Sequence, residues 1–149
     1  MTSTDSVNDA IQDRLNRTVP PMDVAIAEKL LHEVKAIMDH LGVRFFLRQG
    51  TCLGAVRANA FIPWDDDLDL GVVIGLNSFT EQSIGPVLAA FRESGYYVKA
   101  QRADNVIFST LLKNNMRIDL LFHRVIDGQI YHWPGLWFPV SLFNQMKEI

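Results

Sequence analysis

Residues 62–74 read IPWDDDLDLGVVI, and the interpretation of the whole chain starts from this stretch. Four aspartates occur within five positions, 65 to 69, and an apolar run follows them directly. The apolar run predicts a buried strand over about 68–74. Because side chains alternate between the two faces of a strand, Asp67 and Asp69 would share one face and the intervening leucines the other. The sequence therefore predicts a strand with a core-facing apolar side and a side lined with carboxylates.

Two neighbouring carboxylates repel each other, and this repulsion has to be offset. Two of them about 5 Å apart repel by about 3 kcal/mol at an effective dielectric near 20. Such a pair persists if one carboxyl is protonated, if a cation lies nearby or if a metal ion binds. Hard oxygen ligands at this spacing suit Mg²⁺ or Mn²⁺, which also take substrate phosphates as ligands. The sequence therefore predicts that Asp67 and Asp69 bind Mg²⁺ or Mn²⁺.

A third acid fits the same site. Asp119 interrupts the apolar segment RIDLLFH, residues 117–123, where an unpaired acid would be costly. If that strand neighbours the first, Asp119 meets Asp67 and Asp69, and three carboxylates can hold one or two divalent ions. The arrangement suits phosphoryl transfer, so these three residues are the predicted catalytic and metal-binding set.

Other interpretations of the acids stay open at this point. An aspartate run is often a solvated turn or a helix cap, and Asp119 could simply accept hydrogen bonds from backbone donors. An EF-hand calcium loop is excluded. With Asp65 at its first position, Leu70 would replace the glycine at the sixth and Leu76 the glutamate at the twelfth.

The segment RQGTCLGAVR, residues 48–57, predicts a turn that enters a short helix. Gly50 would let the backbone turn tightly and approach a ligand, and Thr51 offers a hydroxyl or a helix cap. A helix N-terminus favours an anion, and Arg48 and Arg57 could contact phosphate oxygens. A purely structural turn remains an alternative, as does an ion pair between Arg57 and an aspartate of the next loop.

Two further side chains have open roles. Trp64 could stack on a base or a sugar, or it could anchor its loop. His123 has no partner that spacing identifies, so a core or surface position is expected for it.

Composition bounds the class of protein. With 149 residues, 48% hydrophobic and 21% charged, the chain suits one globular domain. The net charge of -3 gives no case for nucleic acid or an anionic membrane as a partner. The single cysteine permits no internal disulfide, and neither a signal peptide nor an apolar run of about 18 residues occurs. A cytoplasmic protein without a membrane span is expected.

The pattern along the chain predicts a mixed α/β sheet with helices packed on it. Residues 1–20 form a polar leader, and 21–149 form the domain. Helices are expected over 6–16, over 22–41 with Pro21 in its first turn, from Asn77 or Ser78 to 93, and from 139 onward. Strands are expected over 43–47, 68–74, 96–101, 106–112, 116–123 and 129–132. Tight turns are expected at Asn114–Asn115 and Asp127–Gly128.

The segment FFLRQGTCLGAVRANAFIPWDDDLDLGV, residues 45–72, resembles the signature of the LicD family, the phosphocholine-transferase group that includes fukutin-like proteins. The family pattern is G-T-L-L-G-A-x-R followed by G-F-I-P-W-D-D-D-x-D. Cys52 and Ala60 stand where leucine and glycine are more usual. The matched positions are Gly50, Thr51, Leu53, Gly54, Ala55, Arg57, residues 61–67 and Asp69.

The resemblance implies a nucleotidyltransferase-type fold and a particular reaction. Family members move a phospho-alcohol from a CDP-activated donor, such as CDP-choline or CDP-ribitol, onto a hydroxyl of a glycan or glycolipid, releasing CMP. Lipopolysaccharide or teichoic acid biosynthesis would be the setting. By analogy Asp67 and Asp69 bind the metal, Asp119 is a ligand or the base for the acceptor, and Gly50 and Thr51 contact the donor phosphates. Family members continue past the equivalent of Ile149, so a C-terminal part of the domain is expected to be missing.

Two alternatives to this function remain. An Asp-x-Asp glycosyltransferase that uses a nucleotide sugar would also place paired carboxylates on a metal ion. A metal- or nucleotide-binding module without activity, or an assembly subunit, is the third reading.

Overall fold

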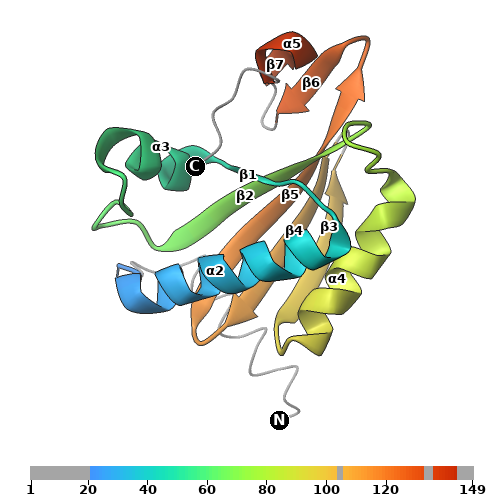
Figure 1. Cartoon of the computed structure of the whole chain (residues 1–149). Helices are drawn as coiled ribbons and strands as arrows, with labels where there is room; N and C mark the ends of the chain where they lie inside the picture. Colours follow the sequence, from blue (N-terminus) through green and yellow to red (C-terminus); the bar gives the residue numbers. More distant parts are fainter. Residues whose placement is uncertain (1–20, 104–105, 133–135, 144–149) are drawn as a thin grey trace.

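A computed structural model describes residues 21–103, 106–132 and 136–143, and its elements form a mixed sheet with two long helices on one face (Figure 1). The predicted leader and the predicted helix over 6–16 lie outside the described residues. The elements, in chain order, are α2 (Val24–Leu41), β1 (Phe46–Leu47), α3 (Gln49–Ala58), β2 (Asp67–Ile74), the 3₁₀ turn η1 (Glu81–Ser83), α4 (Ile84–Glu93), β3 (Tyr97–Ala103), β4 (Val106–Lys113), β5 (Met116–Ile126), β6 (Gln129–His132), β7 (Leu136–Pro139) and α5 (Val140–Phe143).

The sheet has the strand order β1-β2-β5-β4-β3, with β6 paired to β5 and β7 paired to β6. The β2–β5 pair is parallel and all other pairs are antiparallel. In the parallel pair, Asp67 lies opposite Arg117 and Asp69 lies opposite Asp119. Strands distant in sequence are thus neighbours at the centre of the sheet, which places the predicted acids side by side.

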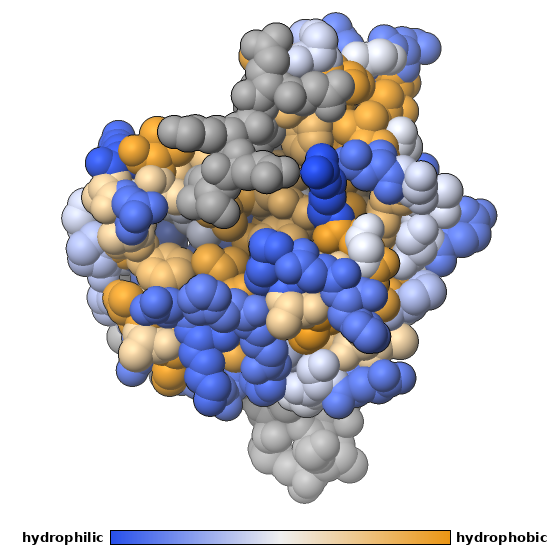
Figure 2. Space-filling model, viewed as in Figure 1, coloured by the Kyte–Doolittle hydropathy of each residue, from blue (hydrophilic) through white to orange (hydrophobic). Residues whose placement is uncertain are grey.

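The core lies between the sheet and helices α2 and α4. From α2, Leu30, Val34 and Met38 are buried against the leucines of β2 at positions 68 and 70. The outward side of α2 is largely hydrophilic, as Figure 2 shows in the same view. The apolar face of β2 therefore packs on helices as predicted, and its carboxylate face is left on the other side of the sheet.

The boundaries of α2 follow local chemistry. Asp23 is the N-cap, and its Oδ1 accepts hydrogen bonds from the backbone N–H groups of Ala25 and Ile26. Gly42 ends the helix with φ 69°, a left-handed conformation that is typical of a glycine after a helix. The prediction that Pro21 lies in the first turn was wrong, because the capping aspartate starts the helix after it.

The other long helix also starts later than predicted. Asn77 and Ser78 have φ values of 52° and 62°, a left-handed conformation that cannot begin an α-helix. The chain instead enters through η1, where Thr80 and Ser83 form a capping box, and α4 follows from Ile84. Residues 77 and 78 are turn residues, not caps.

The strand predictions hold with two exceptions. The first strand was predicted over 43–47, but β1 contains only Phe46 and Leu47. Strand β7 was not predicted, because its sequence, LWFP, is short and contains a proline. It is an edge strand that pairs with β6. The tight turns at Asn114–Asn115 and Asp127–Gly128 are confirmed by positive φ at all four residues. His123 is fully buried, and its Nδ1 lies 3.1 Å from the carbonyl oxygen of Tyr131, so of the two expected positions, core or surface, it takes the core one.

Among the residues that the structure describes, no helix combines the length and the apolar character needed to cross a membrane.

Candidate active site

The carboxylates of Asp67, Asp69 and Asp119 converge on the side of the β2–β5 pair that faces away from α2 and α4. One oxygen from each lies within 4.8 Å of the others, and all three residues are half-buried. Oxygens that share one Mg²⁺ at about 2.1 Å lie about 3–4 Å apart, so a small closure of the side chains would suffice. The three acids fit one hard divalent cation in both ligand type and spacing.

A second acidic group adjoins the first, because Asp65, Asp66 and Asp67 also bring carboxylate oxygens within 4.8 Å of one another. The backbone around Asp65 is held in place: its carbonyl oxygen accepts from Met22 N at 2.9 Å, and its Oδ1 accepts from Asp66 N at 3.0 Å. Asp67 belongs to both groups and so lies at the centre of the negative charge.

This crowding raises the pKa values of two acids in the ion-free protein. Burial, helped by the negative charges of Asp69 and Asp119, raises the pKa of Asp67 to about 8. Burial and Asp119 raise the pKa of Asp69 to about 6, and Arg48 partly opposes this shift. Near neutral pH the empty cluster therefore tends to hold a proton, and a bound divalent cation would replace it.

The stability of the ion-free protein should fall as the pH rises from about 4 to about 8. In the unfolded chain both carboxyls titrate near pH 4, whereas in the folded chain Asp67 titrates at about 8 and Asp69 at about 6. Between these values the folded state binds more protons than the unfolded state, so the free energy of unfolding decreases with pH. Thermal denaturation in EDTA at pH 5, 6.5 and 8 measures this.

Two comparisons make this pH series specific. Asp67→Asn should remove most of the fall, because its amide does not titrate. Saturating Mg²⁺ should flatten it, because the ion replaces the protons. An identical fall in wild-type protein and in Asp67→Asn would show that other groups cause it.

Two arginines flank the three acids. Arg48, only 4% exposed, places Nη1 3.9 Å from Asp69 Oδ1. Arg117 donates from Nε to Asp119 Oδ1 at 2.9 Å. Arg48 was predicted as a phosphate contact, but its burial and its neighbour place it among the acids. Arg117 was not singled out, although its position two residues before Asp119 on a strand put both side chains on one face.

The glycine segment is built differently from the prediction. The left-handed residue is Gln49, with φ 48°, and α3 already starts there. A Cβ at Gly50 would overlap Asp65 Oδ2, so Gly50 admits this carboxylate rather than making the turn. Thr51 does not cap α3; its Oγ1 accepts a hydrogen bond from Asp69 N at 2.9 Å. The segment thus supports the acidic strand directly.

The remaining two predicted residues lie at the surface near this segment. Arg57 is exposed in the last turn of α3, and no aspartate in the described part of the chain lies within ion-pair distance of it. Trp64 is 76% exposed in the loop before β2, so it does not anchor that loop in the core. Neither side chain joins the acidic cluster.

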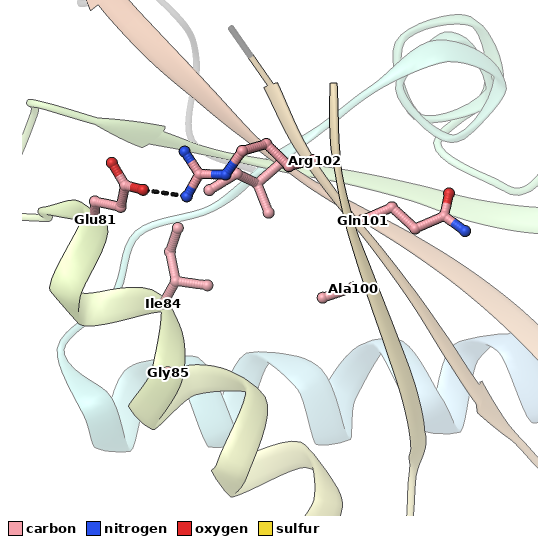
Figure 3. Close-up of a pocket in the computed structure, with 7 residues that line it drawn as sticks. Glu81, Ile84, Gly85, Ala100, Gln101 and Arg102 are labelled. Carbon is pink, nitrogen blue, oxygen red and sulfur yellow. Dashed lines mark hydrogen bonds and ion pairs between the residues drawn. The ribbon is translucent and has the colours of Figure 1, made fainter. Parts of the chain in front are cut away.

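A hollow of the described residues lies elsewhere, away from the acids. It has a volume of about 380 Å³ and lies between α4 and strands β3 and β4, on the helix-covered side of the sheet (Figure 3). Glu81, at its mouth, pairs with Arg102 and with Arg124, the latter at 2.7 Å. The lining residues of the hollow are Glu81, Ile84, Gly85, Ala100, Gln101, Arg102 and Ile107.

Comparison with known proteins links the chain to one family. Residues 42–149 match the family model described as "LicD/FKTN/FKRP, nucleotidyltransferase domain". Ribitol-5-phosphate transferase FKTN of Mus musculus is 34% identical over 100 residues, covering 64% of this chain and 20% of that protein. Ribitol 5-phosphate transferase FKRP of Homo sapiens is 29% identical over 106 residues, covering 70% and 21%. An uncharacterised protein of Rickettsia prowazekii is 32% identical over 84 residues, covering 56% and 30%. The chain thus spans less than a third of the length of these relatives.

Solved structures of low sequence identity share the fold. ANT(2")-Ia in complex with adenylyl-2"-tobramycin superposes with a TM-score of 0.50 at 19% identity, over 68% of this chain and 52% of that one. The Cid1 poly(U) polymerase with bound MgGTP superposes with a TM-score of 0.51 at 11% identity, over 81% and 38%. Together with the family match, these superpositions show that the mixed sheet with packed helices is a nucleotidyltransferase-type fold, as the family resemblance implied.

Proposed function

Since this chain belongs to the LicD/FKTN/FKRP nucleotidyltransferase-domain family, we propose that it transfers a phospho-alcohol from a CDP-activated donor to a hydroxyl of a glycan or glycolipid. The observation that carries the proposal is the convergence of Asp67, Asp69 and Asp119 on two adjacent parallel strands. The names of the relatives favour ribitol phosphate as the transferred group, with phosphocholine as the other candidate. An acceptor in lipopolysaccharide or teichoic acid synthesis and a cytoplasmic location belong to the same proposal.

The three acids would hold Mg²⁺ or Mn²⁺ through one oxygen each. The ion, when bound, would neutralise charge on the donor phosphates and orient them for attack. Asp119 could also receive the proton of the acceptor hydroxyl, and the ion pair from Arg117 Nε fixes the orientation of its carboxylate. Thr51 acts through Asp69, because its hydroxyl holds the backbone N–H of that residue.

The exposed residues beside the cluster are assigned to the donor in this proposal. Trp64 would stack on the base or sugar of the nucleotide, since its ring is largely in solvent and its loop leads into the acids. Arg57 would contact phosphate oxygens from the last turn of α3. Gly50 brings the N-terminus of α3 close to the acidic loop. These roles all concern donor binding, so their loss should raise KM more than it lowers kcat.

A donor panel tests the proposed function. The full chain is incubated with CDP-ribitol, CDP-choline, UDP-sugars or GDP-sugars and a glycan acceptor, in Mg²⁺, Mn²⁺ or EDTA. We expect CMP release and a phospho-alcohol product by mass spectrometry only with a CDP-alcohol and a divalent ion. Millimolar Mg²⁺ should also raise the melting temperature, because an ion that binds only the folded cluster stabilises it.

Each other outcome of the panel points to another function. Turnover of a nucleotide sugar would replace the proposal by glycosyl transfer. Calorimetric binding of Mg²⁺ and nucleotide without turnover of any donor would indicate a binding module. If no divalent ion raised the melting temperature, with or without a CDP-alcohol, the three acids would not be a metal site.

A further inference from the structure

Arg48 is an unusual neighbour for a metal site, because its fixed positive charge would oppose a cation. Its side chain is 3% exposed and that of Asp69 is 16% exposed, and Nη1 lies 3.9 Å from Asp69 Oδ1. Arg48 Nε is buried and has no hydrogen-bond partner among the described residues. A buried guanidinium without full hydrogen bonding is costly, so the field of the nearby carboxylates must offset this cost.

The surrounding structure fixes Arg48 in this position. Its backbone N–H donates to Asp69 O at 2.8 Å, and its carbonyl oxygen accepts from Cys52 N at 3.0 Å. The side chain passes over Gly71 of β2, where an added Cβ would lie 2.9 Å from Arg48 Cδ. The same missing Cβ makes room for the ring of Phe46. The backbone of Arg48 is therefore tied to β2, and its side chain occupies the space that the missing Cβ of Gly71 leaves.

The three carboxylates differ in whether an arginine lies beside them. Arg48 lies beside Asp69, and Arg117 is paired with Asp119. Asp67 forms no ion pair within the described residues, and it is the acid shared by both acidic groups. Among the residues that the structure describes, these two arginines are the cations paired with or next to the three carboxylates, and Arg48 is the more buried of the two.

We propose that Arg48 is a positioning residue that acts as a resident counter-charge. It keeps Asp67, Asp69 and Asp119 converged when no ion is bound, and it lowers the affinity of the empty cluster for a divalent cation. Tight metal binding then requires the additional negative charge of the donor phosphates. This inference rests on the proposed function, because it assumes that the three acids bind the metal.

Arg48→Met tests the inference by two measurements that should move in opposite directions. In EDTA the melting temperature should fall by a few degrees, because three carboxylates lose a fixed cation. The affinity for Mn²⁺ alone, measured by calorimetry on the full chain, should rise about tenfold, because the cation that opposed the ion is gone. Arg48→Lys should stay close to wild type in Mn²⁺ affinity. Arg92→Met, an exposed substitution on α4, is the control and should change neither value.

The double variant Arg48→Met/Asp69→Asn covers the case in which Arg48→Met folds poorly. Removing both charges should be less destabilising in EDTA than the sum of the single changes. Unchanged or weaker Mn²⁺ binding by Arg48→Met, or strictly additive effects in the double variant, would overturn the inference. These failures differ from failure of the proposed function, in which the wild-type protein binds no divalent ion even with a CDP-alcohol present, or turns over no donor.

Discussion

Asp67→Asn is expected to abolish phospho-alcohol transfer while raising the melting temperature of the ion-free protein by a few degrees. Activity should fall more than about a hundredfold, because outer partners of metal ligands already contribute 10–100-fold and Asp67 would be a direct ligand. Stability should rise because the carboxylate is half-buried, its neighbours are acids, and its pKa is raised to about 8 by burial and these charges. The amide keeps the shape and removes the charge.

The matched control is Asp127→Asn, the same chemical change in the β5–β6 turn. Asp127 has φ 51° and precedes Gly128, and such a turn accepts Asn-Gly as readily as Asp-Gly. It should leave both CMP release and the melting temperature unchanged. The measurements are CMP release under saturating Mg²⁺ and thermal denaturation in EDTA. If Asp67→Asn retained near wild-type turnover, Asp67 would not be a metal ligand, whatever its position.

Gly54→Ala is expected to destabilise the protein by about 1–3 kcal/mol and to reduce activity with it. In a solvent-exposed helix position the same change stabilises, because alanine has the higher helix propensity. At Gly54 an added Cβ would overlap the carbonyl oxygen of Ala60 and lie 3.1 Å from Ile62 N. Both are backbone atoms, which cannot rotate away, so α3 must shift from the loop that leads to the acids.

Gly85→Ala is expected to stabilise the protein, in contrast to Gly54→Ala. Gly85 lies in α4, and nothing lies within 4 Å of a Cβ built there. That variant should gain about 0.5–1 kcal/mol through helix propensity alone. Urea denaturation of both variants measures the two signs. Equal stabilisation by both substitutions would show that the 54–62 contact is looser than the structure has it.

The central strands could be predicted because successive side chains of a strand point to opposite faces, and only one orientation buries the leucines. Leu68 and Leu70 had to face the core, so Asp67 and Asp69 had to face away from it, and Asp119 repeated this pattern in a second strand. Family resemblance then supplied the fold, which the comparisons support. The parallel register that sets Asp69 against Asp119 could only be assumed, because it depends on strand pairing over a long sequence separation.

The roles of the glycine segment could not be predicted from its residues. Gly50 and Thr51 each contact the acidic strand or its loop, 15 and 18 positions further on, and no local pattern contains these contacts. The burial of Arg48 likewise depends on the absence of a Cβ at Gly71 across the β1–β2 pair. An arginine before a glycine turn suggested a phosphate ligand, whereas tertiary packing makes it a neighbour of the acids.

The parallel pairing of β2 with β5 also orders events during folding. Fifty positions separate Asp69 from Asp119, and the elements from η1 to β4 lie between them along the chain. Such distant pairings form late, since closing a long stretch of chain costs entropy that only completed packing offsets. A cation held by the three acids would consequently find all its ligands only in the folded sheet, so we expect it to slow unfolding rather than to speed folding.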